Sequence, residues 1–295
     1  MSTLAPLYYK NFKCKAGACE HSCCVGWRVE LDDRTVDLYE SAEGEYADEL
    51  RTRMCKDGDG CFIPSVGGRC PHLTEDGLCR VIIKRGESYL SDICREHPRF
   101  YNFLPERTEL GIGASCPEAA RLILDGESSL ELYELSSESE EAEGYSPLRM
   151  RERIRKILNE SDGYAAAESE IQKLLALPDS ILTPEFRTEL FPTLEYLYPE
   201  NRDLIFGSAD KVAASEDARL SKVLAYFIYR HLAAAEDEAE AVAAVGFALF
   251  SARATEALSI LTKDMAEALR IYSEEIEYST ENTEQIIFAI QSELI

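Results

Sequence analysis

The stretch Lys13 to Cys24, K-C-K-A-G-A-C-E-H-S-C-C, is the most informative part of this 295-residue chain. It places four cysteines, Cys14, Cys19, Cys23 and Cys24, within eleven residues. Four soft sulfur donors so near in sequence meet in one small volume at little cost in loop-closure entropy, and such groups bind zinc or iron–sulfur clusters. The stretch therefore predicts a metal site in an irregular segment of the chain.

All ten cysteines lie in the first 116 residues, and the other six are Cys55, Cys61, Cys70, Cys79, Cys94 and Cys116. Ten thiols exceed the need of a single site, because zinc takes four ligands and a cubane iron–sulfur cluster normally takes four as well. The spacing leaves open two centres, or one centre with free thiols. For Cys55 and Cys61 the expected role is that of small buried apolar side chains.

Histidine and glycine positions narrow the kind of metal site. The four histidines, at positions 21, 72, 97 and 231, show no H-x3–5-H spacing, which excludes a zinc-finger pair. Gly26 stands where a C-x3-C-x2-C radical-cluster motif needs its third cysteine. His21 lies inside the first cysteine group and is an alternative ligand to one thiol, whereas His231 is expected to serve packing or the surface.

Charge and hydropathy exclude several classes of partner. The formal net charge is −24, and it is unevenly spread: residues 1–124 hold 16 basic and 20 acidic side chains, whereas residues 125–295 hold 15 and 35. Such an acidic half repels nucleic acid and anionic lipid, and no basic stripe with interleaved aromatic residues opposes it. No secretory signal pattern and no run of about 18 apolar residues stands out. The expected setting is the cytoplasm, with neither nucleic acid nor membrane as partner, where reduced thiols usually mean metal binding or catalysis.

The pattern along the chain predicts a mainly α-helical protein in two parts. Residues 1–124 are expected to form an irregular cysteine-rich domain with short strands, and residues 147–295 an acidic, all-helical domain. Residues 125–146 are expected to be an acidic linker, because S-S-E-S-E-E at 136–141 is polar and like-charged.

Local signals place several elements. Residues 27–31 alternate as a strand does, and Asp32 and Asp33 offer a helix N-cap before an amphipathic stretch to Tyr39. A short helix is expected over 87–94, a strand over 110–114 and a helix after Pro117, where the dipole and free amides of the first turn would stabilise a thiolate at Cys116. Further helices are expected at 147–160, 163–177, 184–198, 216–234, 237–261 and 262–279, and from about 282.

With these residues in view, the chain resembles the flagellin lysine N-methylase family, which belongs with the wider zinc- or iron-chelating cysteine-cluster proteins. The resemblance extends along residues 6–124. The matching pieces are P-L-Y-Y-K-N-F-K-C (6–14), C-E-H-S-C-C-V-G-W (19–27), C-P-H-L (70–73), D-G-L-C (76–79), G-E-S-Y-L (86–90), C-R-E-H-P-R (94–99) and S-C-P-E (115–118).

The resemblance implies a cytoplasmic enzyme that transfers methyl groups from S-adenosylmethionine to lysine side chains of flagellin or another lysine-bearing protein, with a [4Fe–4S] cluster taking part and zinc as the alternative metal. Cys55 and Cys61 fall outside the family pattern, and the acidic half carries no motif of the family. The metal ligands that the resemblance implies are Cys14, Cys19, Cys23, Cys24, Cys70, Cys79, Cys94 and Cys116.

Catalytic and cofactor-binding residues are not singled out by the sequence. Lysine methylation needs a neutral amine, a methyl sulfonium in line with it and an acceptor for the amine proton. No glycine-rich loop sits between a strand and a helix as a Rossmann-type methyltransferase requires. Arg95 and Arg99 are candidates for a carboxylate or phosphate contact, with a surface ion pair as the alternative.

Two readings from other functional classes remain open. In one, the chain is a non-catalytic zinc- or iron–sulfur-binding module whose helical domain recruits a protein partner. In the other, it is a redox or cluster-transfer protein that carries its cluster as cargo. Colour separates iron–sulfur from zinc, and methyl transfer separates the enzyme from both alternatives.

Overall fold

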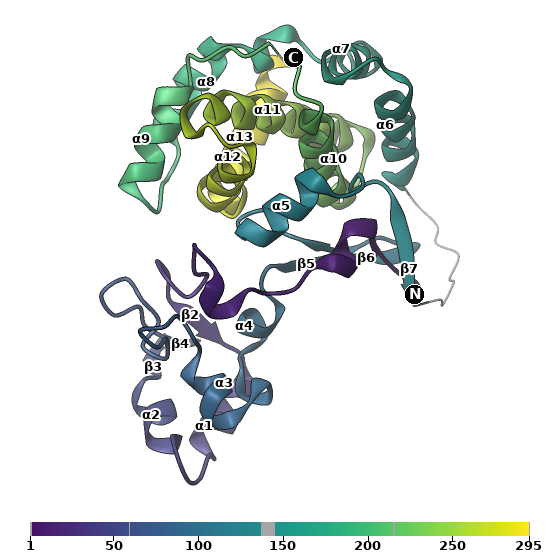
Figure 1. Ribbon diagram of the computed structural model, residues 1–295. Coiled ribbons are helices and arrows are strands. Elements are labelled where there is room, and N and C mark those ends of the chain that lie inside the picture. Colours follow the sequence, from purple (N-terminus) through teal and green to yellow (C-terminus); the bar gives the residue numbers. More distant parts are fainter. Residues whose placement is uncertain (1, 59, 137–144, 215, 295) are drawn as a thin grey trace. The chain divides into compact units, whose positions relative to one another are not determined.

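The computed structural model describes residues 2–58, 60–136, 145–214 and 216–294. The protein is mainly α-helical, with its strands in the first 136 residues (Figure 1), and this confirms the predicted fold class. By packing, the chain divides into two compact units. Residues 13–99 form one, called the thiol unit below, and residues 1–12 with 100–295 form the other, called the helical unit.

These units differ from the expected division at residues 124 and 147. Residues 1–12 and 100–124 pack with the helices, because a strand near the start of the chain pairs with strands that follow residue 99. Within the expected linker, residues 132–136 form a strand. The rest of its acidic core, residues 137–144, lies outside the described residues.

The thiol unit combines a small sheet with short helices. Its three strands are antiparallel in the order β2-β4-β3. Asp32 caps the first helix as predicted, with its side chain accepting a hydrogen bond from the backbone of Thr35. The elements are β2 Val29–Leu31, α1 Asp33–Glu40, α2 Ala47–Thr52, β3 Cys55–Asp57, β4 Gly60–Ile63, α3 Arg80–Arg85 and α4 Asp92–Glu96, with short 3-10 turns at Ala16–Ala18 and Glu87–Tyr89.

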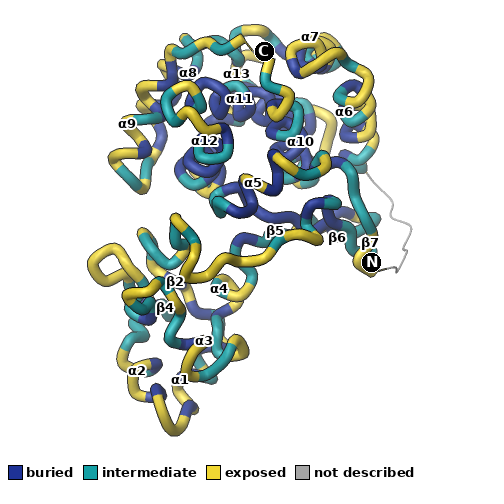
Figure 2. The backbone as a smooth tube through the Cα atoms, in the orientation of Figure 1, coloured by how far each residue is buried: buried dark blue, intermediate teal, exposed yellow. Residues whose placement is uncertain are grey.

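The apolar core of the thiol unit is small. Figure 2 shows that most of residues 13–99 are intermediate or exposed, in contrast to the long helices of the other unit. Among the described residues, the buried hydrophobic side chains of this unit are Val29, Leu31, Tyr39, Ala42, Tyr46, Ala47, Leu50, Ile63 and Val81. Units with so few core residues commonly need a further staple such as a metal ion.

The helical unit contains a four-stranded sheet in the order β5-β6-β1-β7. Strand β1 (Ser2–Pro6) runs parallel to β6 (Arg107–Ile112) and antiparallel to β7 (Leu132–Ser136), and β5 (Arg99–Phe103) lies at the other edge. The sequence predicted the strand at β6. It did not predict β1 or β7, whose pairing joins segments more than 100 residues apart.

The predicted helices of the second half are present in the helical unit, with two differences. The expected helix 184–198 ends at Leu190, where the turn Phe191–Thr193 contains Pro192. A helix beginning at Pro199 was missed, because proline interrupts helices but also suits their first turn. The helices are α5 Pro117–Asp125, α6 Leu148–Glu160, α7 Tyr164–Leu175, α8 Pro184–Leu190, α9 Pro199–Ser208, α10 Arg219–His231, α11 Glu238–Thr262, α12 Met265–Tyr272 and α13 Thr280–Glu293.

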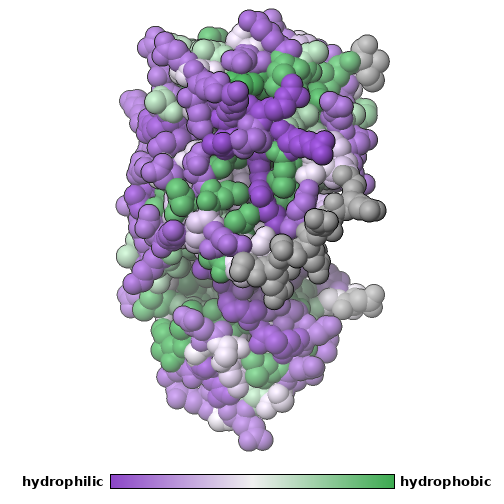
Figure 3. Space-filling view, turned by 90° about the vertical axis from the view of Figure 1, so that its right-hand side faces the viewer, coloured by the Kyte–Doolittle hydropathy of each residue, from purple (hydrophilic) through white to green (hydrophobic). Residues whose placement is uncertain are grey.

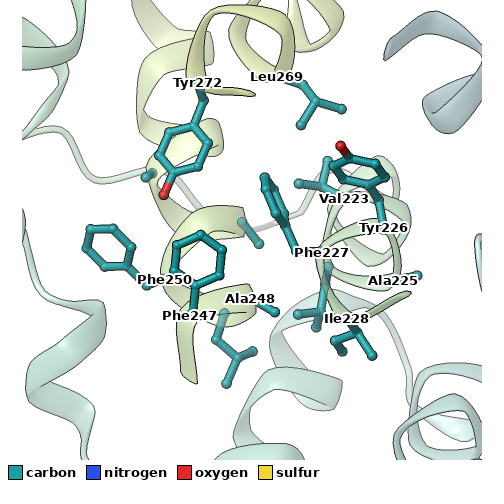
Figure 4. Close-up of a cluster of buried hydrophobic side chains, with 14 of the residues drawn as sticks. Val223, Ala225, Tyr226, Phe227, Ile228, Phe247, Ala248, Phe250, Leu269 and Tyr272 are labelled. Carbon is teal, nitrogen blue, oxygen red and sulfur yellow. The ribbon is translucent and has the colours of Figure 1, made fainter. Parts of the chain in front are cut away.

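Aromatic side chains fill the core of the helical unit where α10, α11 and α12 meet (Figure 4). The ring of Phe227 lies 6.1 Å from that of Phe247 and 5.7 Å from that of Tyr272, both nearly perpendicular to it. Such edge-to-face contacts add to the hydrophobic effect of burial. The central helix α11 is long and apolar enough, by length and composition, to cross a membrane, which corrects the expectation that no stretch qualifies. The protein buries 89% of its most apolar window inside the fold.

A network of buried polar groups surrounds Glu277, at the end of the π-helical segment Ser273–Glu277. Its carboxylate, which is fully buried, accepts a hydrogen bond from Tyr226 Oη at 2.8 Å and lies 2.8 Å from His231 Nε2 and 3.3 Å from Arg230 Nε. Ser273 also donates to it. His231 therefore serves core packing, as the sequence predicted, and the carboxylate charge is compensated by the guanidinium group.

Candidate metal centre

Four thiols gather in the thiol unit from four separate segments. Cys24 lies in the loop before β2, Cys70 in the loop after β4, Cys79 at the N-cap of α3 and Cys94 within α4, and each is partly buried. The backbone N–H of Cys70 donates to the carbonyl of Cys24 at 2.8 Å, and Leu73 forms a β-bridge with Cys79. Helix α4 packs against β2. We call these four residues the thiol group.

The members of the thiol group interact electrostatically with one another. Burial raises the pKa of Cys94 to about 12, and the charges of Cys24, Cys70 and Cys79 each add to this increase. Burial likewise raises the pKa of Cys70 to about 11, with Cys24 and Cys79 contributing. Like charges repel over short distances in a low-dielectric interior, so each thiolate raises the pKa of the other thiols.

Cys24 differs from the other members of the group. A hydrogen bond with the neighbouring Cys23 lowers its pKa to about 7, and Ser22 and Arg69 act in the same direction. This thiol is therefore partly ionised near neutral pH, in the form that binds metals.

Backbone and hydroxyl groups are placed to stabilise thiolates at the other three positions. The N–H of His72 donates to Cys70. The backbone N–H groups of Val81 and Ile82, in the first turn of α3, lower the pKa of Cys79. A side-chain hydrogen bond joins Ser91 to Cys94. Each of these groups favours the charged form and opposes the effect of burial. The thiol group thus has the donor chemistry of a site for zinc or an iron–sulfur cluster.

The remaining predicted ligands have different surroundings. Cys14 is exposed, and its sulfur accepts a hydrogen bond from Ala16 N at 3.4 Å. Cys19 donates to the carbonyl of His21 at 2.9 Å, and Cys23 is exposed beside Cys24. Cys116 belongs to the helical unit, where it is the N-cap of α5 without a side-chain capping bond.

The two cysteines outside the family pattern lie on neighbouring strands. Cys61 on β4 packs against the small apolar core, and Cys55 on β3 is partly buried. Among the residues described, no group of three or more His, Cys, Asp or Glu side chains is arranged to hold a metal ion. The four segments of the thiol group therefore have to draw closer than they stand here if they are to share one metal centre.

Arg95 forms ion pairs at the surface rather than presenting free donors. Its guanidinium lies 2.5 Å from Asp92 and 3.4 Å from Glu96. This supports the surface ion pair, the alternative left open by the sequence. Arg99 Nη1 contacts the carbonyl of Arg95 at 3.5 Å.

Two aromatic residues near the thiol group were missed by sequence reasoning. Tyr39 is 1% exposed; burial raises its pKa, and Cys94, Cys79 and Cys70 raise it further. His72 is also 1% exposed and hydrogen-bonds to Tyr46. The sequence does hold a signal for His72, which is its position in C-P-H-L between Cys70 and Cys79.

Gly17 lies in the first cysteine segment, residues 14–24, and allows this segment to approach the loop between Cys70 and Cys79 closely. A β-carbon at this position would lie 2.7 Å from the backbone oxygen of Asp76 and 3.0 Å from Leu78. Because a backbone atom cannot swing aside, we expect Gly17→Ala to destabilise the thiol unit by about 1–3 kcal/mol. Urea unfolding checks this value. Gly60→Ala is the matched control, since its β-carbon would make only an ordinary 3.6 Å contact; equal losses in both variants would contradict the close-approach argument.

Asp32 connects α1 by hydrogen bonds to the segment that carries Cys94. Its carboxylate caps α1 through Thr35 and accepts a hydrogen bond from the backbone of Asp92 at 2.8 Å, next to the start of α4. Arg34 reinforces this contact by donating to the carbonyl of Leu90 at 2.9 Å. The Asp32 contacts thereby fix the position of α4 relative to α1.

We expect Asp32→Ala to lower the free energy of unfolding by about 1–2 kcal/mol at pH 7. Burial alone raises the pKa of Asp32, but hydrogen bonds from Asp92 and Thr35 outweigh it and leave the pKa below its ordinary value. A depressed carboxyl pKa contributes stability above the unfolded value of about 3.9, and that contribution is lost as the pH falls through the folded value. The gap between wild type and variant, measured by urea unfolding, should therefore narrow below about pH 4. The exposed neighbour Asp33→Ala serves as control, and a gap that widens in acid would refute the assignment.

Fold and site together define a cysteine-rich protein in which a small thiol unit accompanies a larger helical unit. The chain is 31% identical over 136 residues to the lysine-N-methylase of Salmonella choleraesuis, covering 44% of this chain and 34% of that protein. It is 30% identical over 137 residues to the Salmonella typhimurium lysine-N-methylase, with the same coverage of each. It is also 30% identical over 139 residues to the flagellar biosynthetic protein FliU of Salmonella muenchen, covering 45% of this chain and 82% of FliU.

The chain belongs to the flagellin lysine N-methylase family. It matches about a third of the length of the two lysine-N-methylases. No protein-family model matches the chain, and no solved structure does.

Proposed function

We propose that this protein is a protein-lysine N-methyltransferase that uses S-adenosylmethionine, acts on flagellin and depends on a cysteine-bound [4Fe–4S] cluster. The observation that supports it best is the convergence of Cys24, Cys70, Cys79 and Cys94 in a chain related to lysine-N-methylases. The small apolar core of the thiol unit agrees with a need for a bound metal group. Zinc is the alternative occupant, since four thiolates suit it equally.

The proposed reaction is a direct methyl transfer. The neutral ε-amine of a lysine attacks the methyl carbon of the sulfonium, a C–N bond forms, and the C–S bond breaks with its electron pair left on sulfur as S-adenosylhomocysteine. The extra proton on nitrogen passes to a base. Thiolates of the thiol group would hold the cluster. With all four bound, it would supply a fixed centre for the thiol unit; with three bound, one iron would keep an open position as an anchoring point for the cofactor.

The ligand set under this proposal begins with the thiol group and draws further on the first cysteine segment. Cys23 is hydrogen-bonded to Cys24, while Cys14 and Cys19 lie on the loop that Gly17 presses against the segment before Cys79. Cys116 enters the proposal only through its place in the family pattern. Surplus thiols would form a second site or stay free.

Charge supports a protein substrate rather than a nucleic acid or a membrane. Residues 125–295 carry 35 acidic against 15 basic side chains, which attracts a lysine-bearing surface and repels phosphate backbones and anionic lipid. Figure 3 shows hydrophilic residues over most of the side of the helical unit that carries α6 and β7, between smaller apolar patches. The ten cysteines, all within the described residues, form no disulfide with one another, which agrees with a reducing compartment such as the cytoplasm.

Methyl transfer to flagellin tests the proposed activity directly. The full chain is purified without oxygen and analysed for iron. It is then incubated with S-adenosylmethionine and unmodified flagellin, and the mass of the flagellin is measured by mass spectrometry. We expect mass increases in multiples of one methyl group, located on lysines, and none when the iron has been removed. Unchanged flagellin in the presence of an iron-loaded chain would contradict catalysis on this substrate. It would favour the alternative, a non-catalytic metal-binding module that recruits a protein partner.

A further inference from the structure

One polar atom beside the thiol group is buried without a hydrogen-bond partner. The His72 side chain is 1% exposed, and its Nδ1 lies 2.8 Å from the Tyr46 hydroxyl. Its Nε2 has no partner among the described residues. A buried ring nitrogen left without a hydrogen bond costs about 1–3 kcal/mol, so a fold that keeps one has a use for it or binds something there.

His72 lies between two members of the thiol group. Its own N–H donates to the sulfur of Cys70, and its carbonyl accepts the N–H of Arg80, the residue after Cys79, at 2.8 Å. Tyr46, whose hydroxyl is hydrogen-bonded to the Nδ1 atom of the ring, interacts electrostatically with the Cys79 thiol. The backbone of His72 is therefore bonded to the same segments that carry Cys70 and Cys79.

The ring has a defined hydrogen-bonding pattern, with the Tyr46 hydroxyl at Nδ1. A neutral imidazole carries one N–H and one acceptor nitrogen. When the Tyr46 hydroxyl donates to Nδ1, the proton of the ring stays on Nε2, the atom without a partner.

We propose that His72 Nε2–H donates a hydrogen bond to a sulfur of the metal group held by the thiol group, with Tyr46 fixing the tautomer. This inference rests on the metal centre of the proposed function. His72 is then a positioning and tuning residue rather than a metal ligand. Hydrogen bonds to metal-bound sulfur stabilise its negative charge, and this contributes to the reduction potential of an iron–sulfur cluster.

Nitrogen couplings in the reduced cluster test the proposal. The full chain is labelled with ¹⁵N-histidine, loaded anaerobically with iron and sulfide, reduced with dithionite and measured by pulsed electron paramagnetic resonance. We expect one weak ¹⁵N coupling in the wild type, its absence in His72→Leu, and its persistence in His21→Gln, the matched control in the first cysteine segment. A strong coupling, which signals direct coordination, or a weak coupling that survives His72→Leu would overturn the proposal.

The reduction potential gives a second readout that a purely structural role would not change. At equal iron content, His72→Leu should shift the potential to more negative values. Tyr46→Phe removes only one hydroxyl and keeps the ring in place, so it should give a smaller shift in the same direction even where the His72 variant folds poorly. Unchanged potentials in both variants would contradict this inference alone. A wild-type chain that takes up no iron would instead contradict the proposed function, and the inference with it.

Discussion

Replacing Cys79 by serine is expected to remove most of the bound iron and to destabilise the thiol unit. The thiol stands at the N-cap of α3, where the backbone N–H groups of Val81 and Ile82 favour its charged form, the form that binds metals. A serine hydroxyl stays protonated at neutral pH and is a poor ligand for soft metals. We expect the affinity for the metal to fall by more than the roughly 10- to 100-fold seen for changes outside the ligand set.

Metal analysis and unfolding of anaerobically prepared protein measure this effect. Because metal binding and folding are coupled in units with small cores, the metal-dependent part of the stability, on the order of several kcal/mol, should disappear with the iron. Cys55→Ser is the matched control, since Cys55 is also a partly buried thiol of the same unit but lies on β3 outside the thiol group. Equal iron content in the two variants would refute the assignment of Cys79.

Replacing Glu277 by alanine is expected to lower the free energy of unfolding of the helical unit by about 3–5 kcal/mol. The substitution leaves the largely buried Arg230 without its counter-ion and removes the acceptor of Tyr226, His231 and Ser273. Breaking a buried ion pair from one side costs more than the pair contributes, because the remaining charge stays desolvated. Urea unfolding followed by circular dichroism of the helices provides the measurement.

A milder variant and a surface control make the Glu277 prediction specific. Glu277→Gln keeps an acceptor oxygen for Tyr226 and should be less damaging than alanine. Glu281→Ala, at an exposed position in the first turn of α13, should change stability by less than about 0.5 kcal/mol. A loss below about 1 kcal/mol in Glu277→Ala would show that water reaches the network and that its charges are not buried as described.

Local sequence signals predicted the elements that depend on their own residues. Asp32 before an amphipathic stretch predicted the start of α1, and the side chain does cap that helix. Pro117 predicted the start of α5, because proline suits the first helical turn. The same rule explains why α9 was missed: proline usually interrupts a helix, whereas Pro199 begins one.

Pairings between distant segments lay beyond the reach of local patterns. Strand β1 at the start of the chain pairs with β6 and β7, and this pairing places residues 1–12 in the helical unit. The residues of β1 do not indicate which strands it pairs with, and the residues of β6 and β7 do not indicate β1. The predicted boundary at residue 124 therefore followed the end of the cysteines rather than the packing of the chain.

The cysteine spacing predicted a metal site but not its geometry. The crowding at Cys14 to Cys24 drew attention to the first segment, whereas the thiols that gather in the thiol unit come mostly from later segments, with Cys24 the member from the first. Burial decides which thiols meet, and burial depends on how α3 and α4 pack on the sheet. His72 illustrates the same limit, since only the fold reveals that its Nε2 is buried and has no hydrogen-bond partner in the described part of the chain.

Iron and sulfide analysis combined with X-ray absorption at the iron and zinc edges, on the full chain purified without oxygen, tests the central claim most directly. The account predicts a brown protein with about four iron and four sulfide per chain and iron surrounded by sulfur, as a cysteine-bound cubane cluster requires. A colourless protein with zinc bound by four sulfurs would contradict the iron–sulfur assignment. A protein whose thiols bind no metal at all would contradict the metal centre itself.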